Sequence, residues 1–251
     1  MNLAIIQARM GSTRLPGKVL MDVHGKSLLK QLVDRIRPSE KLDEIIIATT
    51  ENSEDDPIET YCAKNNIICF RGSDWDVLDR FYKAANSLDS QPDNIVRICC
   101  DNPLHSYKVV DFVVGHFEKA GTDYFSNSNQ EPDYLEDGFD VEVFTYASLE
   151  SAWKDAKLLS EREHVCPYIK KTFSCGWKKA NQDYKFKLSV DTQADLDAVR
   201  TIFEELKDTP DFSIDEVVDL LNRKPEILDL NNESKINSGY KKSLDNDKIV
   251  K

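Results

Sequence analysis

Apolar and polar residues follow two different periods along this chain. In the first half, short apolar runs alternate with segments whose apolar residues recur at helical spacing, as at Leu28, Leu32 and Ile36. Strands that alternate with helices predict a mostly parallel α/β sheet with right-handed crossovers, flanked by helices. The strands are expected at 3–6, 44–50, 67–70 and 94–100, and the helices at 28–36 and from residues 57 and 76 onward.

The second half departs from this alternation. We expect a smaller, mixed excursion at about residues 127–182 within a single domain of residues 1–230. Asp191 and Thr192 are expected to cap an amphipathic helix, and residues 231–251, with few apolar anchors, are expected to form a frayed tail. Further strands are expected at 123–126, 138–144, 175–180 and 185–190, further helices at 148–157, 163–173 and 212–221, and a mobile loop at 127–137.

Composition narrows the class of protein. The 251 residues carry a formal net charge of −12, which argues against broad nucleic-acid binding but allows a local basic pocket for a nucleotide. Six cysteines show no CxxC pair and no zinc-type spacing, so we expect buried free thiols; a redox pair at Cys99 and Cys100 is the alternative. Without a leader pattern or a run long enough to span a membrane, we expect a soluble, cytoplasmic protein.

The loop after the first expected strand has the chemistry of an anion site. Glycines let backbone N–H groups approach an anion closely, and cations supply charge where a polyphosphate would lie. The loop therefore predicts a triphosphate cradle; a solvated basic loop is the alternative. It is not a P-loop, because five residues separate its glycines and Val19 follows the lysine, and GxGxxG is absent. The residues concerned are Arg9, Gly11, Ser12, Thr13, Arg14, Gly17 and Lys18.

Two carboxylates follow expected strands. Asp101 ends the strand at 94–100, and Asp191 ends the strand at 185–190 and begins a helix. Loops at the carboxyl ends of parallel strands open onto one crevice, where such a pair can hold Mg²⁺ against phosphate oxygens. Each also has an ordinary structural interpretation, Asp101 as a turn former and Asp191 as part of a helix cap.

Other charged residues have two interpretations each. Arg71 and Arg80 flank a strand-to-helix turn and can face phosphate or an acidic co-substrate, although Arg80 also suits a surface pair with Asp76. Arg97 lies within a strand and needs a partner if it is buried. The remaining histidines, His24, His105 and His116, form no coherent metal set.

A second group of polar residues lies in the later half. Asp140 and Glu142 share one face of an expected strand and contact either a polar ligand or water. Glu163 and His164 are expected to open a helix, where His164 either donates to a substrate or is a satisfied structural histidine.

The segment from Gln7 to Leu20 resembles the signature loop of the cytidylyltransferases that make CMP-activated sugar acids. The match is to the SpsF-like branch of spore-coat polysaccharide biosynthesis, a relative of the CMP-Kdo and CMP-sialic acid synthetases, and it covers about residues 1–230. Later blocks agree in order: Phe70 to Ser73, Asp76 to Arg80, Asp101 to Leu104, Gly138 to Phe144, Arg162 to Ile169, and Val190 to Leu196. Two positions depart from the family pattern, Cys100 in place of glycine and His105 in place of an acid.

This resemblance implies a Rossmann-like nucleotide-diphospho-sugar transferase fold, a homodimer, and transfer of CMP from CTP to a sugar acid with release of pyrophosphate. A side chain at Cys100 is expected to crowd the base or ribose. The implied roles are CTP binding by Ala8, Arg9, Gly11, Ser12, Arg14, Lys18 and Arg71, Mg²⁺ binding by Asp101 and Asp191, and acceptor contacts by Arg71, Arg80, Asp140, Glu142, Glu163 and His164.

In the expected reaction, the acceptor hydroxyl attacks the α-phosphorus of CTP in line. Lys18 and Arg14 stabilise the leaving pyrophosphate, while Mg²⁺ on Asp101 and Asp191 offsets the charge on the phosphoryl oxygens. No general base is assigned. Two alternatives remain: a nucleotidyltransferase that uses another nucleotide or a sugar phosphate, and a nucleotide-binding regulatory or scaffold protein without catalysis.

Overall fold

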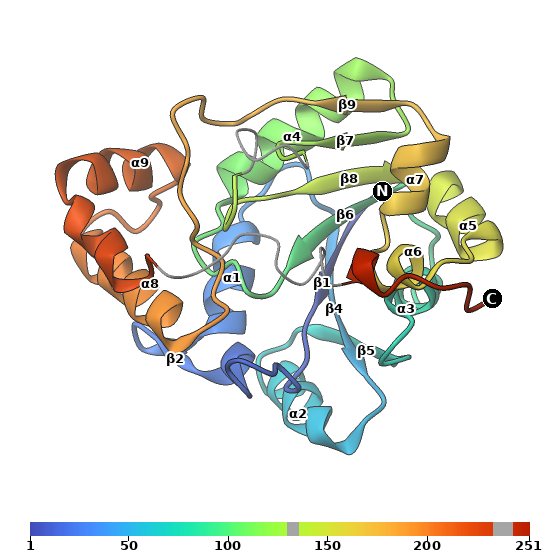
Figure 1. Cartoon of the computed structure of the whole chain (residues 1–251), viewed down its shortest axis with the longest axis horizontal. Coiled ribbons are helices and arrows are strands. Elements are labelled where there is room, and N and C mark those ends of the chain that lie inside the picture. Colours follow the sequence, from blue (N-terminus) through green and yellow to red (C-terminus); the bar gives the residue numbers. More distant parts are fainter. Residues whose placement is uncertain (130–135, 233–242) are drawn as a thin grey trace.

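One seven-stranded sheet organises the part of the chain that the computed structural model describes, residues 1–129, 136–232 and 243–251 (Figure 1). Its strand order is β5-β4-β1-β6-β8-β7-β9, and within this part only β8 runs antiparallel to its neighbours. A short hairpin pairs β2 with β3. The strands are β1 (Asn2–Gln7), β2 (Asp22–Val23), β3 (Lys26–Ser27), β4 (Glu44–Thr50), β5 (Ile68–Gly72), β6 (Asn94–Cys99), β7 (Tyr124–Ser126), β8 (Glu142–Thr145) and β9 (Cys175–Trp177).

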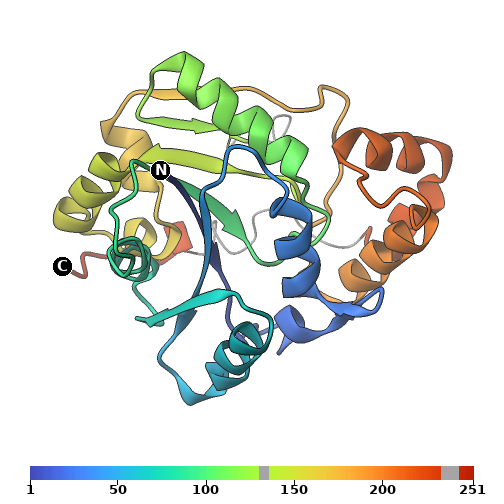
Figure 2. The ribbon, with the colours of Figure 1, turned by 180° about the vertical axis from the view of Figure 1, so that it is seen from behind.

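Helices cover both faces of this sheet. The α1, α2 and α4 helices pack on one face, which Figure 2 shows from the front, and α3, α5 and α7 pack on the other. The expected Rossmann-like α/β fold with a mixed second half is confirmed. The helices are α1 (Leu28–Ile36), α2 (Asp56–Lys64), α3 (Val77–Ala85), α4 (Tyr107–Ala120), α5 (Tyr146–Asp155), α6 (Leu159–His164), α7 (Pro167–Thr172), α8 (Gln193–Glu205) and α9 (Ile214–Arg223), with 3-10 turns η1 (Lys18–Leu20), η2 (Ser53–Asp55) and η4 (Pro225–Leu230).

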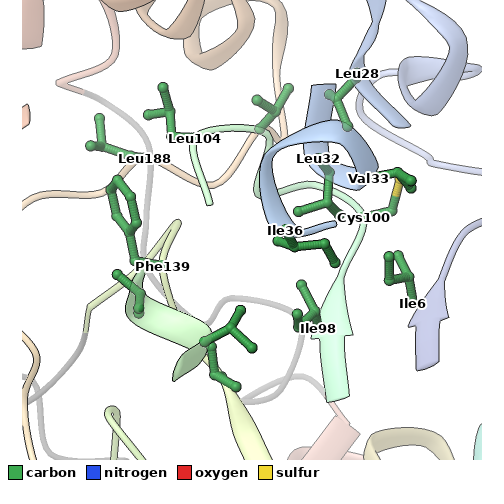
Figure 3. Close-up of a cluster of buried hydrophobic side chains, with 14 of the residues drawn as sticks. Ile6, Leu28, Leu32, Val33, Ile36, Ile98, Cys100, Leu104, Phe139 and Leu188 are labelled. Carbon is green, nitrogen blue, oxygen red and sulfur yellow. The ribbon is translucent and has the colours of Figure 1, made fainter. Parts of the chain in front are cut away.

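The core beneath α1 fixes the strand ends from which the site is built. The helix begins where Ser27 Oγ accepts a hydrogen bond from Lys30 N, a standard N-cap. Its apolar side chains lie over Ile6 of β1 and Ile98 of β6 (Figure 3). Burial of each large aliphatic side chain contributes about 1.5–3 kcal/mol, so the ends of β1 and β6 are held rigidly.

The expected strand at 185–190 does not form, although its residues are extended and mostly apolar. Its backbone amides at Leu188 and Ser189 donate to the carboxylate of Asp137, at 2.9 and 2.7 Å, instead of to a neighbouring strand. Gly138 lies against this segment with φ 95°, and a β-carbon there would come 2.8 Å from Leu188 Cβ. The carboxylate of Asp137 therefore takes the place of a strand partner.

Three other expected elements are shorter than the sequence pattern indicates. The strand expected at 175–180 ends at Trp177. The strand expected at 138–144 begins only at Glu142. The helix expected at 163–173 is divided into α6 and α7, because Val165 adopts φ 68° and interrupts the helical hydrogen bonds before Pro167. Glu163 and His164 therefore end a helix; the expectation that they open one is wrong.

Of the tail expected at 231–251, residues 243–251 are held against α6, and residues 233–242 lie outside the described part of the chain. Asp247 accepts hydrogen bonds from Ser160 N and Oγ, and Leu159 N donates to Lys248 O at 2.8 Å. Figure 1 shows this segment beside α6. Of the loop expected at 127–137, residues 130–135 lie outside the described part of the chain. Among the described helices, none has the length and apolar character needed to span a bilayer.

Candidate active site

The strands β1 and β6 bring their following loops to one edge of the sheet. They are parallel neighbours, and Gln7 lies opposite Cys99. Asp101 follows β6 directly. The backbone N–H of Val190 donates to Asp101 O at 2.8 Å, which places Asp191 beside Asp101. Both predicted carboxylates therefore reach the crevice, even though only one of them follows a strand.

The loop between β1 and η1 is folded by its own backbone. Ser12 N and Gly17 N both donate to Met10 O, at 2.8 and 2.9 Å, and Gly17 turns the chain with φ 72°. A residue with a side chain is strained at that φ, which explains the glycine before Lys18. Gly11 lies beside Glu54, whose Oε1 would be 2.7 Å from a β-carbon at position 11.

Lys18 joins the loop to both carboxylates. Its Nζ lies 3.0 Å from Asp101 Oδ2, 3.4 Å from Asp191 Oδ1 and 2.6 Å from Val190 O. Burial lowers the pKa of Lys18, but attraction to Asp101 and Asp191 outweighs it and leaves the pKa above its ordinary value. Lys18 is therefore charged at neutral pH.

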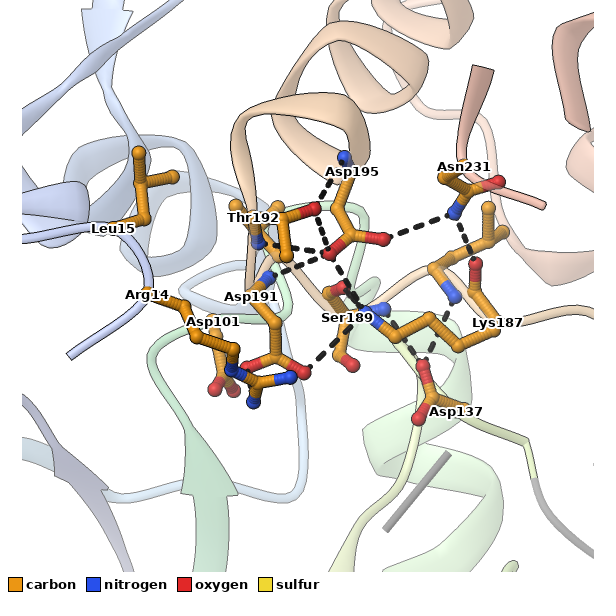
Figure 4. Close-up of polar contacts among 12 residues, drawn as sticks. Arg14, Leu15, Asp101, Asp137, Lys187, Ser189, Asp191, Thr192, Asp195 and Asn231 are labelled. Carbon is orange, nitrogen blue, oxygen red and sulfur yellow. Dashed lines mark hydrogen bonds and ion pairs between the residues drawn. The ribbon is translucent and has the colours of Figure 1, made fainter. Parts of the chain in front are cut away.

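Asp191 is surrounded by cations and by helix-capping groups (Figure 4). Arg14 Nη2 lies 3.0 Å from Asp191 Oδ1, on the same oxygen as Lys18, and Lys187 Nζ lies 3.3 Å from Oδ2. Lys187 also lies 3.0 Å from Asp195 Oδ2, whose carboxylate accepts hydrogen bonds from Thr192 at the start of α8. Asp191 is thus tied to the cap of α8.

Arg14, Lys18, Asp101 and Asp191 are among the residues that line a cleft of about 530 Å³. Its cationic end holds the carboxylate pair, and its other end lies between the start of α3 and the end of α6. The lining includes Gln7, Ala8, Arg9, Ser12, Thr13, Arg14, Lys18, Asp74, Trp75, Arg80, Cys99, Cys100, Asp101, Leu159, Glu163, His164 and Asp191.

Arg80 is a buried cation in this lining. The residue is 2% exposed, Nη1 donates to Ser73 O at 2.8 Å, and within the described residues its Nε has no hydrogen-bond acceptor. Burial, and then the nearby charge of Arg9, lowers the pKa of Arg80 to about 10. The surface pair with Asp76 does not form, because Asp76 binds Arg162. A buried guanidinium without a carboxylate partner favours an oxygen-bearing ligand in the cleft.

Comparison with known proteins identifies the kind of site. The sequence profile of the family described as Cytidylyltransferase matches residues 3–237. The chain belongs to the cytidylyltransferase family.

Relatives of this chain match nearly its whole length. Spore coat polysaccharide biosynthesis protein SpsF of Bacillus subtilis is 33% identical over 235 residues, 89% of this chain and 95% of that protein. An uncharacterised protein of Methanocaldococcus jannaschii is 38% identical over 238 residues, 91% of this chain and 93% of that protein. A solved cytidylyltransferase structure from Leptospira borgpetersenii has a TM-score of 0.84 at 30% identity and covers 94% of this chain and 98% of its own.

Two predicted residues, Arg71 and Glu142, have structural partners outside the cleft lining. Arg71 donates to Thr50 O and Asn52 O and pairs with Glu59 at 2.9 Å, which attaches β5 to the start of α2. Glu142 is buried and joins three strands to α7: the residues that contact its carboxylate are Arg97, Tyr124 (2.6 Å) and Lys170 (2.7 Å). Arg97 thereby has the partner that its burial requires.

Asp140 also lies outside the cleft lining. It precedes β8 and accepts a hydrogen bond from Asn102 Nδ2 at 3.0 Å. Burial raises the pKa of Asp140 to about 7, and the neighbouring carboxylates of Asp137, Glu142 and Asp101 act in the same direction.

Glu163 and His164 do lie in the cleft, at the end of α6. Glu163 Oε2 accepts a hydrogen bond from Ser243 Oγ at 2.7 Å, so the end of the chain contacts a cleft residue. Burial lowers the pKa of His164 below its ordinary value, which favours the neutral imidazole at neutral pH.

Cys100 faces the core more than the cleft. It is buried in the cluster under α1, near Val33 (Figure 3), although it also borders the cleft. All six cysteines are free. Among the described residues, no cluster of three or more His, Cys, Asp or Glu side chains suits a metal ion; the carboxylate pair stands by itself.

Trp75 in the cleft lining and Lys187 beside it were not predicted from the sequence. Trp75 lies at the rim of the cleft with 54% of its surface exposed; a tryptophan in the turn after a strand end was the available signal. Lys187 was missed because nothing in an extended segment indicates which carboxylate its ammonium will meet.

Proposed function

We propose that this protein transfers CMP from CTP to a hydroxyl of a sugar acid and releases pyrophosphate. The observation that carries the proposal is the convergence of Arg9, Arg14 and Lys18 with Asp101 and Asp191 on one cleft. Polyphosphate needs the cations, and a divalent ion bound to polyphosphate needs the carboxylates. The name of the relative SpsF supports a role in surface polysaccharide biosynthesis.

The carboxylate pair fits a divalent cation. Asp101 and Asp191 already reach one positive group, since the Lys18 ammonium lies within 3.4 Å of both. Oxygen ligands of this kind suit Mg²⁺. When bound there, Mg²⁺ would supply positive charge that offsets the charge on the phosphoryl oxygens.

The protein's own groups act by positioning and electrostatics. As the acceptor oxygen forms its bond to the α-phosphorus, the bond between the α-phosphorus and the oxygen that bridges to the β-phosphorus breaks. Pyrophosphate leaves with the electron pair of that bond. Arg14 and Lys18 stabilise the leaving pyrophosphate at the cationic end. The acceptor hydroxyl gives up its proton to solvent water during the transfer.

The acidic character of the acceptor is supported by Arg80. Its buried guanidinium lies in the cleft lining and forms no ion pair with the described carboxylates. A ligand carboxylate would supply the missing countercharge, and Arg binds planar carboxylates well. Glu163 and His164 lie in the cleft lining at the end of α6, and we propose that they contact the hydroxyls of the sugar.

The test is pyrophosphate release with Mg²⁺, each of the four nucleoside triphosphates in turn, and matched panels of acidic sugars, neutral sugars and sugar phosphates. We expect release only with CTP and an acidic sugar. Release with another nucleotide or a sugar phosphate would replace the proposed substrates with those of the second enzyme hypothesis. Thermal stabilisation by CTP without turnover on any acceptor would favour a binding protein.

An Arg80→Met variant tests the acceptor assignment separately. It should raise the KM for the acidic sugar about tenfold or more while the KM for CTP is unaffected. We also propose the homodimer that the family resemblance implies, and light scattering of the purified protein measures it.

A further inference from the structure

Lys18 holds together the two carboxylates that are proposed to bind the metal. Its ammonium lies 3.0 Å from Asp101 Oδ2 and 3.4 Å from Asp191 Oδ1, and it donates to Val190 O at 2.6 Å. The side chain is only 11% exposed. One cation therefore already occupies the space between Asp101 and Asp191.

We propose that Lys18 competes with the divalent cation for this pair of carboxylates. Without nucleotide, Lys18 pairs with both Asp101 and Asp191 and keeps free metal out of the site. When the nucleotide binds, the Lys18 ammonium moves from the two carboxylates to the phosphates. The metal that is bound to these phosphates then takes the position between the carboxylates. This inference rests on the proposed function, and it makes metal binding depend on nucleotide.

Simple electrostatics supports the exchange. A divalent cation bound by both carboxylates would stand next to the ammonium, and two cations in a site shielded from water repel each other strongly. The triphosphate offers Lys18 new negative charge at the moment when the metal arrives. Arg14, whose Nη2 is 3.0 Å from the same Asp191 oxygen, is 44% exposed and has room to move in the same way.

Lys187 differs from Lys18 in that it stays on Asp191 and acts as a positioning residue. Its ammonium lies on the other oxygen of Asp191, Oδ2, at 3.3 Å, and also contacts Asp195 Oδ2 at 3.0 Å (Figure 4). Lys187 is outside the cleft lining, and Asp195 is fully buried. Lys187 therefore fixes Oδ2 of Asp191 to the cap of α8 and leaves Oδ1 toward Lys18.

The experiment measures Mn²⁺ binding by electron paramagnetic resonance without nucleotide. Wild-type protein should bind Mn²⁺ weakly, Lys18→Met about tenfold or more tightly, and Lys18→Arg, which keeps the charge, as weakly as wild type. Adding Asp191→Asn to Lys18→Met should abolish the gain. Equal Mn²⁺ affinity of wild type and Lys18→Met, or an equal gain in Lys18→Arg, would overturn the proposal.

Further variants control for misfolding of Lys18→Met and test the role of Lys187. Circular dichroism shows whether Lys18→Met folds, and Lys18→Gln provides a second neutral variant. Adding Lys187→Met to Lys18→Met should weaken Mn²⁺ binding about tenfold, with recovery in Lys187→Arg, because the second oxygen of Asp191 loses its anchor. Unchanged affinity would remove the positioning role.

The result is separable from the proposed function. A gain of Mn²⁺ affinity in Lys18→Met, together with no CTP turnover in wild type on any acceptor, would support the exchange and reject the substrate assignment. CTP turnover in wild type with no gain in Lys18→Met would support the function and reject the exchange.

Discussion

Arg162 of α6 and Asp76 at the start of α3 form a buried ion pair across 86 residues of sequence. Arg162 Nε lies 2.9 Å from both oxygens of Asp76, and Nη2 lies 2.5 Å from Oδ2. Asp76 also caps α3 by accepting a hydrogen bond from Asp79 N. The pair joins the two helices that form the far wall of the cleft.

Breaking this pair should destabilise the protein strongly. Arg162→Met leaves the buried Asp76 carboxylate without its cation, and Asp76→Asn leaves the guanidinium without its anion, so each should lower the free energy of unfolding by about 3 kcal/mol. Urea unfolding measures it. The double variant should lose less free energy of unfolding than the sum of the two single variants.

The matched control is Lys154→Met, which removes an exposed pair with Glu150 and should lower the free energy of unfolding by about 0.5 kcal/mol or less. An equally small loss in Arg162→Met would show that the buried pair contributes no more than a surface pair.

Trp75 should report nucleotide binding directly. Its indole is exposed at the rim of the cleft, between Asp74, which pairs with Arg9, and Asp76, which is held by Arg162. A ring that stacks there removes the indole from water, so CTP should change the intrinsic fluorescence. Trp75→Phe should remove this change, and Trp75→Ala should weaken CTP binding about tenfold.

Trp177 supplies the matched control for that measurement. It is 46% exposed on β9 and outside the cleft lining, so Trp177→Phe should leave both the CTP response and the affinity unchanged. A fluorescence response that survives in Trp75→Phe and disappears in Trp177→Phe would place the nucleotide elsewhere.

His105 should make the protein sensitive to acid. Burial lowers the pKa of His105 to about 4, and its Nε2 lies 3.3 Å from Asp140 O. An unfolded histidine titrates near pH 6.5, so between pH 6.5 and 4 the unfolded state binds more protons and stability falls as the pH falls. The free energy of unfolding should drop by up to about 3 kcal/mol over this range.

A His105→Gln variant should remove that slope whatever it does to the stability at pH 7. His24→Asn is the control, because the His24 imidazole is 41% exposed; its unfolding curve should keep the wild-type dependence on pH. An unchanged slope in His105→Gln would assign the acid sensitivity to other groups.

Asp101 should be essential for turnover. Asp101→Asn keeps the shape of the side chain but removes a charge that is needed to offset metal and ammonium, so turnover should fall about 100-fold or more with the fold retained. Steady-state pyrophosphate release and the melting temperature measure the two effects. Asp208→Asn, an exposed change outside the cleft, should be neutral; near-normal turnover in Asp101→Asn would exclude Asp101 from the metal site.

The partners of the two arginines around β5, Arg71 and Arg80, could not be predicted from the sequence. Arg71 and Arg80 lie nine positions apart around one turn, and the same roles were expected of both. In the structure, Arg71 forms an ion pair with Glu59 and donates hydrogen bonds to backbone oxygens beside α2. Arg80 instead lies in the lining of the cleft. Which carboxylates lie near a guanidinium depends on how β5, α2 and α3 pack, and local sequence does not contain that information.

The alternating pattern around β8 likewise predicts a strand but not the partners of its acidic side chains. Alternation correctly indicated a strand that contains Glu142, yet period two does not say what covers each face. Lys170 on α7 and Arg97 on β6 meet Glu142 only after the antiparallel β8 has entered the sheet between β6 and β7.

The amino-acid pattern was sufficient to predict the alternation of strands and helices, the cationic loop after β1, the acid after β6 and the family. These features depend on neighbours within a few residues, through hydrophobic period, turn chemistry and capping. Tertiary structure alone decided that Asp137 replaces a strand partner for residues 188 and 189, that Lys18 lies between Asp101 and Asp191, and that residues 243–251 lie on α6. Each of these is a pairing of charges or backbone groups that are far apart in the chain, and such groups become neighbours only when the core has packed.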